Sequence, residues 1–598
     1  NYDNAIPYLS QIITNNNLDK TINRERLIIL QGQCLLQTSQ KNKAKELFIG
    51  EFNSLTNSKY KNSANALIID ISFGNSDWDD VIKWASIIRE SKPSTDQLTR
   101  ALYQMGFAHY QKDQIPEAIK ALNSSRENSI SKKWETRTAY LLGECFSKNQ
   151  QLEEAEEKFT IALKGMLAAE AKECHYRLGV TRLSLEKFEQ SLSNFKSFIG
   201  TRENQNANIT DPKIRQATLY MGRIHYELKQ YPKAEAEFQK LVTGDDNLAA
   251  QSNLWLARVF STGKQDYINA SQILGRALTK YNNSELVDNI EFEYANSLML
   301  KSPPEWQKAV AALSNIENRG KNPQGPKFPQ AAEVLSQKVV CLHNLKDYQT
   351  SLTYSDQLVS QFPNHKSKVD TLFIRAENLL QLKKYKDALN AFNNFLKNAP
   401  EHNKSNLANL RIAQLHHINK DWDNALIKAE PLLSLSKSNN KFSQVAFILG
   451  DSYFMKQNWA QAVSFLKIFI TGFQINKVSI DSNLIKNTPN LDRAYLQIGI
   501  AHDRLDAKNE ALKSLSTLIE NAPKECEQLP LALVETGRIA FQQNNLALSR
   551  KVLQQYLESQ SLESFKKNIV TQIPQVMYYL GWVNSCLLYT SDAADELT

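Results

Sequence analysis

Glycine and proline are scarce in this chain. Its 598 residues include only 19 Gly and 17 Pro, about half of the combined share of roughly 12% that is usual in proteins. A β-sandwich or a doubly wound sheet needs more turn residues than this, so the composition argues against both classes. Because 42% of the residues are apolar and 22% are charged, the chain is not disordered either. The composition therefore predicts a nearly all-helical fold.

Long apolar runs and paired cysteines are also missing. No run approaches the ~18 residues that a membrane span requires, so we expect no transmembrane segment. Five of the six cysteines stand singly and without CxxC spacing, at Cys34, Cys145, Cys174, Cys341 and Cys526, and the sixth, Cys586, lies in the terminal segment described next. This use of cysteine indicates neither a disulfide framework nor a zinc site.

The two ends of the chain differ from its body. The first residue is Asn1, and no apolar targeting segment follows it. Residues 586–598 break with the Asn/Lys/Ile-rich composition before them, and their first eleven residues match one reading frame of a transposon-end sequencing adapter. We expect this segment to be an artefact that does not pack as a native helix, and the body, 1–585, to be truncated at both ends. Without the three acidic residues of this segment, the net charge rises from +8 to +11.

Internal repetition dominates the body. A small residue recurs after an apolar one with a period of about 37 residues, and we call this position the leading slot. A second small residue, the second slot, follows twelve residues later in twelve of fourteen units. The leading slots are Gly32, Ile69, Gly106, Gly143, Gly179, Gly222, Ala257, Ala295, Val339, Ala376, Ala413, Gly450, Gly499, Gly537 and Gly581.

The residues around the second slot predict a pair of helices in each unit. An aromatic stands three residues before this slot in ten units, as at Trp78 and Tyr385, and Phe or Leu often stands four residues after it, as at Phe159. Spacings of three and four place these side chains on one helix face. Proline then ends the second helix in several units, as at Pro363 and Pro400. Small residues in both slots allow the two helices to approach closely.

This pattern resembles that of the tetratricopeptide repeat family, in a bacterial-type variant. The resemblance covers residues 1–585 and implies an all-α fold: one continuous α-solenoid of about fourteen antiparallel helix pairs, wound as a right-handed superhelix with the first helices on its inner face. The period exceeds the family's 34 residues, and the tryptophan that the family carries before the glycine is absent. The units at Ile69 and Val339 are degenerate, so we expect the solenoid to bend or loosen there.

No residue pattern indicates catalysis. His109, His225, His416 and His502 each stand three residues after a leading slot, so we interpret them as structural members of the repeat. No P-loop, HExxH or Ser-His-Asp order occurs. We therefore expect neither an enzyme nor a cofactor or metal site.

The inner face offers a candidate partner site. By the family's geometry, residues six, three and two before the leading slot, and one and four after it, point into the groove. Between the third and seventh units these positions combine forked guanidinium donors with rigid aromatic area, which is typical of binding hot spots. The candidate residues are Arg100, Tyr103, Tyr110, Arg137, Tyr140, Tyr176, Arg177, Tyr220, Arg223, Tyr226 and Arg258. Glu144, Glu173 and Glu227 share this groove, and a solvated helical face is the competing interpretation.

Three functions compete at this point. The first is a non-enzymatic scaffold that binds a protein partner, as an extended peptide or a helix with acidic and apolar side chains, and no small-molecule substrate. The second is the solenoid arm of an enzyme whose catalytic domain lies beyond Ser585. The third is an RNA-binding solenoid, but +11 over 585 residues is a dilute charge, so we expect no nucleic-acid partner. The units around Pro363 and Pro400 resemble those of envelope-assembly and Tol-Pal-associated bacterial proteins, which implies a periplasmic or outer-membrane-associated location.

Overall fold

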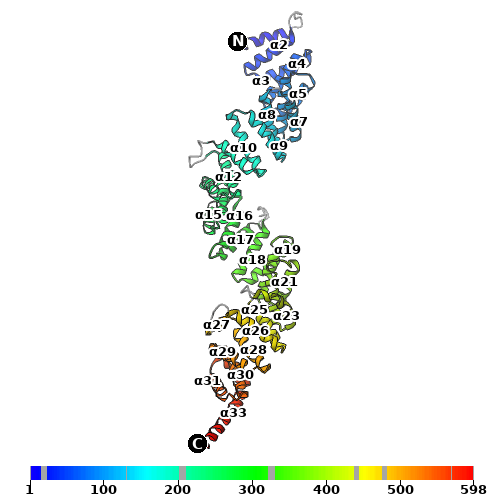
Figure 1. Cartoon of the computed structure of the whole chain (residues 1–598). Helices are drawn as coiled ribbons and strands as arrows, with labels where there is room; N and C mark the ends of the chain where they lie inside the picture. Colours follow the sequence, from blue (N-terminus) through cyan, green and yellow to red (C-terminus); the bar gives the residue numbers. More distant parts are fainter. Residues whose placement is uncertain are drawn as a thin grey trace. The chain divides into compact units, whose positions relative to one another are not determined.

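The computed structural model describes residues 2–14, 23–129, 131–200, 210–320, 330–436, 443–474, 481–566 and 569–596. All regular secondary structure in these ranges is helical (Figure 1). The chain forms two compact units, Asn1–Pro304 (unit 1) and Glu305–Thr598 (unit 2). In each unit, successive helices pack antiparallel as the pairs that the sequence predicts, which confirms an all-α solenoid architecture.

Unit 1 consists of helix pairs in which the even-numbered helix is the first of its pair and the next helix is the second. Its α-helices are α1 (Tyr2–Thr14), α2 (Arg24–Gln37), α3 (Lys41–Glu51), α4 (Ser58–Gly74), α5 (Trp78–Glu90), α6 (Thr95–Gln111), α7 (Ile115–Glu127), α8 (Lys132–Lys148), α9 (Leu152–Gly165), α10 (Ala168–Ser184), α11 (Phe188–Ile199), α12 (Pro212–Glu227), α13 (Tyr231–Gln239), α14 (Asn247–Arg258), α15 (Tyr267–Lys280) and α16 (Val287–Leu300).

Unit 2 has the same pairing, with short helices added between some pairs. Its α-helices are α17 (Trp306–Gly320), α18 (Ala331–Asn344), α19 (Tyr348–Gln361), α20 (Lys368–Gln381), α21 (Tyr385–Asn398), α22 (Ser405–Ile418), α23 (Trp422–Ala429), α24 (Leu433–Ser436), α25 (Gln444–Met455), α26 (Trp459–Gln474), α27 (Ser482–Asn487), α28 (Leu491–Arg504), α29 (Lys508–Asn521), α30 (Leu529–Gln542), α31 (Leu546–Glu558), α32 (Glu563–Lys566) and α33 (Ile569–Glu596).

The two helices of a pair meet through a fixed contact between the leading slot and the residue sixteen positions later. A Cβ added at Gly222 would lie 2.5 Å from the Phe238 ring, and one added at Gly499 would lie 2.5 Å from Leu515. Eight leading glycines show this contact, at 1.9 to 2.9 Å. Glycine is therefore required there because the partner side chain occupies the space of its Cβ.

The second slot faces the backbone of the first helix. Where this slot holds serine, its Oγ donates to the carbonyl oxygen of the leading residue, as from Ser191 to Gly179 (2.6 Å) and from Ser549 to Gly537 (2.8 Å). The two small residues thus do not simply face each other, as the sequence suggested. One makes room for a side chain and the other for a carbonyl.

The units with a large leading residue reverse the sizes. Ile69 and Val339 are fully buried, and the residues sixteen positions later are Ala85 and Ser355, which are also fully buried. A large residue opposite a small one fills about the same volume as a glycine opposite a phenylalanine, and such exchanges are well tolerated in cores. Both degenerate pairs are therefore closely packed, which argues against the expected loosening.

The turn inside each pair explains how a glycine-poor chain makes so many turns. The residue seven positions after the leading slot has a positive φ, for example 60° at Asp113 and 59° at Lys383. The amide of Gln114 then donates to the carbonyl of His109 (2.9 Å), which closes the helix end. Polar residues occupy this left-handed position where glycine is usual, so the scarcity of glycine did not indicate a scarcity of turns.

Two second slots come late in the sequence. Ala270 is one residue late because a π-helical turn, Val259–Gly263, takes up the extra residue at the end of the first helix. Ala309 is two residues late, and the pair predicted around it is divided, since α16 belongs to unit 1 and α17 to unit 2. Both irregularities thus fall between the two helices of a pair.

The last helix departs from the repeat. α33 continues to Glu596 without the turn that follows other leading slots, and a Cβ at Gly581 would meet no described atom within 4 Å. The backbone is thus helical through most of the predicted artefact, whose origin stays a prediction. In the ranges that the structure describes, no helix combines the length and the apolar content needed to cross a membrane.

Candidate partner-binding face of the first helices

The eleven candidate residues lie on five successive first helices of unit 1: α6, α8, α10, α12 and α14. Their slot positions place them along one side of each helix, at the joints between neighbouring pairs. The six tyrosines are half-buried, whereas Arg100, Arg137 and Arg177 are exposed. The sequence therefore located the helices correctly, and the contacts of each side chain decide what it can bind.

Three of the five arginines already bind carboxylates of a neighbouring first helix. The Arg100 guanidinium lies 2.6 Å from Asp70 of α4, Arg177 lies 3.2 Å from Glu144 of α8, and Arg258 lies 2.9 Å from Glu293 of α16. Arg177 is also 3.3 Å from Glu173, one turn before it on α10. These three arginines join one repeat to the next, so much of their charge is neutralised.

Burial raises the pKa of two carboxylates in these joints between repeats. Burial raises the pKa of Glu144, while the nearby Arg177 acts in the opposite direction. Burial likewise raises the pKa of Asp70, against Gln104 and Arg100. In both cases the desolvation of the carboxylate outweighs the arginine beside it.

The other two arginines lie on tryptophans. The Arg137 guanidinium is 5.6 Å from the ring centre of Trp134, and that of Arg223 is 5.2 Å from Trp255. Within the described part of the chain, neither has a carboxylate at ion-pair distance. Their charges are therefore available to a partner, and the rings hold them in place through cation–π contacts.

Sequence reasoning missed both tryptophans. Trp255 stands two residues before the leading slot Ala257, and this is one of the groove positions. The candidate residues at groove positions included only arginines and tyrosines. It also lies 4.7 Å from the Arg258 guanidinium and 5.4 Å from the Tyr226 ring. Trp134 lies 5.3 Å from the Tyr103 ring at the start of α8.

The tyrosines pack between repeats. Tyr176 lies 5.1 Å from Phe198, and Tyr220 lies 5.6 Å from Phe195, between ring centres. Burial raises the pKa of Tyr103, Tyr140 and Tyr176, so these phenols stay protonated at neutral pH. The rings form part of the core edge, and their exposed parts add rigid area to the face.

Two of the histidines and two of the cysteines make contacts within the fold. His109 and His225 bond through Nδ1 to Gln114 and Gln230, at 2.7 and 2.9 Å, which ties the end of the first helix to the turn. Burial raises the pKa of Cys145 and Cys341 to about 12, so both thiols stay protonated. Among the described residues, no group of three or more His, Cys, Asp or Glu side chains is placed to hold a metal ion.

Comparison with known proteins identifies the class of this fold. A family model described as tetratricopeptide repeat matches residues 176–259 and 375–439. These ranges include the pairs α12–α13 and α22–α23, whose leading and second slots are the ones described above. These two stretches of the chain match tetratricopeptide repeats, and repeats of this family generally mediate protein–protein interaction.

The solved structures that this chain is similar to have low sequence identity to it and low TM-scores. A tetratricopeptide repeat protein from Parabacteroides merdae is 13% identical, with a TM-score of 0.33, and the match covers 46% of this chain and 98% of that one. PilF from Pseudomonas aeruginosa is 16% identical, with a TM-score of 0.30 and coverages of 40% and 97%. The apo quorum sensor NprR from B. thuringiensis is 15% identical, with a TM-score of 0.32 and coverages of 56% and 97%. No curated protein matches the chain in sequence.

Proposed function

We propose that the protein is a non-enzymatic scaffold that binds a partner segment, either extended or helical, on the first-helix face of unit 1. One observation supports this most strongly: Arg137 and Arg223 carry unneutralised charges held on half-buried tryptophans. Arginine and tryptophan are the residues most enriched in binding hot spots. The proposed face is thus narrower than the eleven residues suggested. Its two charged anchors belong to the units of Gly143 and Gly222, which are two repeats apart.

The partner's chemistry follows from these anchors. A carboxylate can pair with each guanidinium in a bidentate way. The exposed parts of Trp255 and Tyr226 give apolar area beside the second anchor. The proposed partner is therefore a protein segment with acidic side chains next to apolar ones.

Selection of peptides from a random display library on the full-length chain tests this function. We expect the selected peptides to be rich in Asp or Glu next to aromatic or aliphatic residues. The double variant Arg137→Ala, Arg223→Ala should weaken their binding at least tenfold, given about 1 to 2 kcal/mol for each effective hot-spot residue. Circular dichroism should show unchanged helicity.

The matched control removes the same charge elsewhere in unit 1. Arg126 and Arg276 lie on the second helices α7 and α15, so the variant Arg126→Ala, Arg276→Ala should bind as the wild type does. Equal weakening by both double variants would show that net charge, and not this face, attracts the peptides. Unchanged binding in the first double variant would refute the proposed site.

A further inference from the structure

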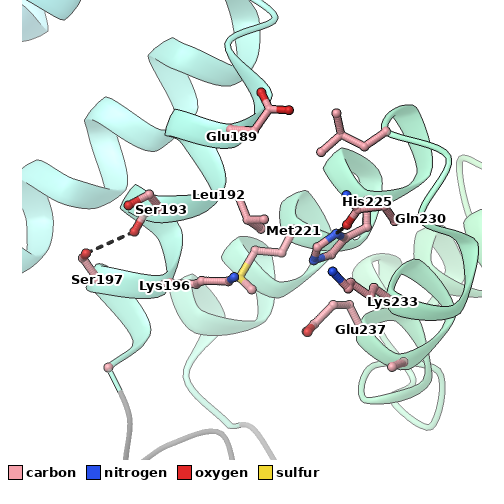
Figure 2. A pocket seen from close by; sticks show the side chains of 13 residues that line it. Glu189, Leu192, Ser193, Lys196, Ser197, Met221, His225, Gln230, Lys233 and Glu237 are labelled. Carbon is pink, nitrogen blue, oxygen red and sulfur yellow. Dashed lines mark hydrogen bonds between the residues drawn. The ribbon is translucent and has the colours of Figure 1, made fainter.

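A pocket of about 920 Å³ opens between the second helices α11 and α13, with α12 as its floor (Figure 2). Its floor is apolar and includes Met221, Leu192 and Leu228. Lys196 of α11 and Lys233 of α13 line opposite sides, and the buried imidazole of His225 lies beside Lys233 (Figure 2). This pocket is formed largely by second helices, so it is separate from the arginine and tryptophan face.

The two lysines of the pocket carry free charge. Both side chains are exposed, and within the described ranges neither ammonium has a carboxylate at ion-pair distance. The neighbouring Glu237 is bound to Lys240 instead, at 2.8 Å. The pocket therefore contains two lysine charges without an ion-pair partner in the described ranges, and the carboxylate of Glu189 also lines it.

His225 adds a hydrogen-bond acceptor to this site. Burial lowers the pKa of His225, and Lys233 and Lys196 lower it further against the influence of Gln230 and Glu237. The ring is thus neutral at pH 7. Because Nδ1 bonds to the Gln230 side-chain oxygen at 2.9 Å, Nε2 is left as an acceptor. The pocket can accept one proton donor beside an anion.

No other pair of adjacent repeats has this combination. The lysines occupy two repeat positions, five residues after one second slot (Lys196) and one residue before the next (Lys233). In every other pair of successive units at least one of these two positions is neutral or acidic. In unit 2 one equivalent pair is Asp356 and Asp387, and Asp387 lines a second pocket, of about 480 Å³. The charge of the first pocket is thus a local feature and not a property of the repeat.

The surface at His502 is a natural reference for this pocket, because the same repeat positions surround a buried histidine there. There the same two positions hold Lys467 and Glu510. Burial lowers the pKa of His502, Lys467 lowers it further, and Glu510 acts in the opposite direction, so both side chains lie close to this ring. Both places have a buried histidine and one lysine. They differ at the other position, which holds Lys233 beside His225 and Glu510 beside His502.

We propose that the pocket between α11 and α13 is a binding site for a small organic anion, a carboxylate or phosphate ester with an apolar group. Lys196 and Lys233 pair with the anion, and Met221, Leu192 and Leu228 contact the apolar part. A hydroxyl or N–H group on the ligand donates to His225 Nε2. A pocket of this size is ordinary for a small ligand.

Titration of the full-length chain with 8-anilinonaphthalene-1-sulfonate, an anion with apolar rings, tests this site by fluorescence. We expect saturable binding that Lys233→Glu weakens at least tenfold and that Lys196→Gln weakens severalfold. Both lysines are exposed, so the variants should keep their helicity by circular dichroism. At the surface around His502, the variant Glu510→Lys reproduces the two lysines and should add a second binding site of similar affinity.

Competition identifies the anion and completes the test. Hexanoate or hexyl phosphate should displace the probe from the wild type, and the stronger competitor shows which anion the site prefers. Hexanol should not displace it, because it lacks the charge. The site is refuted if Lys233→Glu binds the probe as the wild type does, if hexanol competes as well as the anions do, or if Glu510→Lys gains no site.

Discussion

The first-helix faces of the two units use the same positions in different ways. In unit 1, Arg223 meets the Trp255 ring of the next repeat. In unit 2, the corresponding position holds Asp451, which is fully buried and lies 2.6 Å from His417 and 2.7 Å from Arg493. A carboxylate at this joint neutralises the cations around it by ion pairing. A tryptophan ring contacts the cation but leaves its charge unneutralised.

Carboxylate joints are the commoner arrangement along the chain. The residue after one leading slot pairs with the residue two before the next, as Glu144 with Arg177 in unit 1 and Glu377 with Arg411 in unit 2 (2.8 Å). Asp503 of unit 2, four residues after its leading slot, is held by Lys508 (2.6 Å) and by Arg538, which stands one residue after the next leading slot. A repeat position thus predicts that two side chains meet, but their identities decide whether the joint stabilises the fold or stays open to a partner.

The largest effect should come from the contact that both units use to close their helix pairs. Phe238→Ala in unit 1 empties the space beside Gly222 and should lower the free energy of unfolding by about 3 to 5 kcal/mol. Adding Gly222→Ile should recover a large part of this loss, since it copies the fully buried pair Ile69 and Ala85, and Val339 with Ser355 in unit 2 reverses the sizes in the same way. Hydrogen exchange of α12 and α13 measures both effects. A double variant no more stable than Phe238→Ala would contradict the exchange of sizes.

Breaking the carboxylate joint of unit 2 should cost nearly as much. Asp451→Ala leaves Arg493 and His417 without their shared partner, which should cost about 3 kcal/mol. The matched change in unit 1, Arg223→Ala, removes a cation–π contact worth about 1 kcal/mol or less at a half-exposed site. Hydrogen exchange in α25 and α28, compared with α12 and α14, separates the two. Similar losses in both would show that the joints are alike.

Acid should act on the two units in opposite directions at these joints. Burial would raise the pKa of Asp451, but His417, Gln497 and Arg493 bring it below its usual value. A lowered folded-state pKa adds stability above the unfolded value, near 4, and this stability is lost as the pH falls through the folded pKa. The pKa of Glu144 is raised, so its ionisation costs stability and acid relieves that cost.

Amide exchange measured from pH 6 to pH 3 distinguishes these signs. The contribution of Asp451 is the difference in protection between the wild type and Asp451→Asn in α25, and it should shrink as the pH falls. For Glu144, the measured quantity is the difference in amide protection of α8 between the wild type and Glu144→Gln. This difference should shrink as the pH falls from 6 to 3, because Glu144 becomes protonated and neutral like glutamine. A pH-independent difference at either site would contradict the assigned pKa direction.

A smaller effect should be common to both units. Lys229 in unit 1 and Lys383 in unit 2 have φ values of 57° and 59°, a left-handed conformation that costs a non-glycine residue about 1 kcal/mol. Replacing either by glycine should stabilise its pair by up to about 0.5 to 1 kcal/mol, less the entropy that glycine loses on folding. Thermal unfolding of each variant measures this. A gain in one unit alone would show that the turns differ.

The smallest effect should come from the end of the chain. Deleting residues 586–598 should leave the protection of α30 and α31 unchanged within about 0.5 kcal/mol, the range of an ordinary surface change. We expect this because the segment does not belong to the repeat. Loss of protection in α31 would show that the segment stabilises its neighbours, and independent long-read sequencing showing the same thirteen codons would contradict its artefactual origin.

Much of the fold was predictable because a repeat states the same local rule many times. Helix pairs, their boundaries and the slots follow from spacings of three, four and twelve residues, and a weak signal becomes strong in fourteen copies. The site was predictable only as a set of positions. Arg223 and Arg258 both stand one residue after a leading slot, yet Arg258 pairs with Glu293, and in the described ranges Arg223 has only the Trp255 ring.

The sequence by itself determined the period, the class of fold and the helix faces that could bind, because these depend on residues within about one repeat. Only the tertiary structure decided which arginines keep their charge, why Ile69 packs as well as a glycine does, and that Lys196 and Lys233 share a pocket. Each of these depends on two side chains from different helices, and the sequence does not state which pairs come into contact. Charge neutralisation and volume filling act over a few ångströms. The side chains that a residue contacts therefore decide whether it can bind a partner, and its repeat position alone does not.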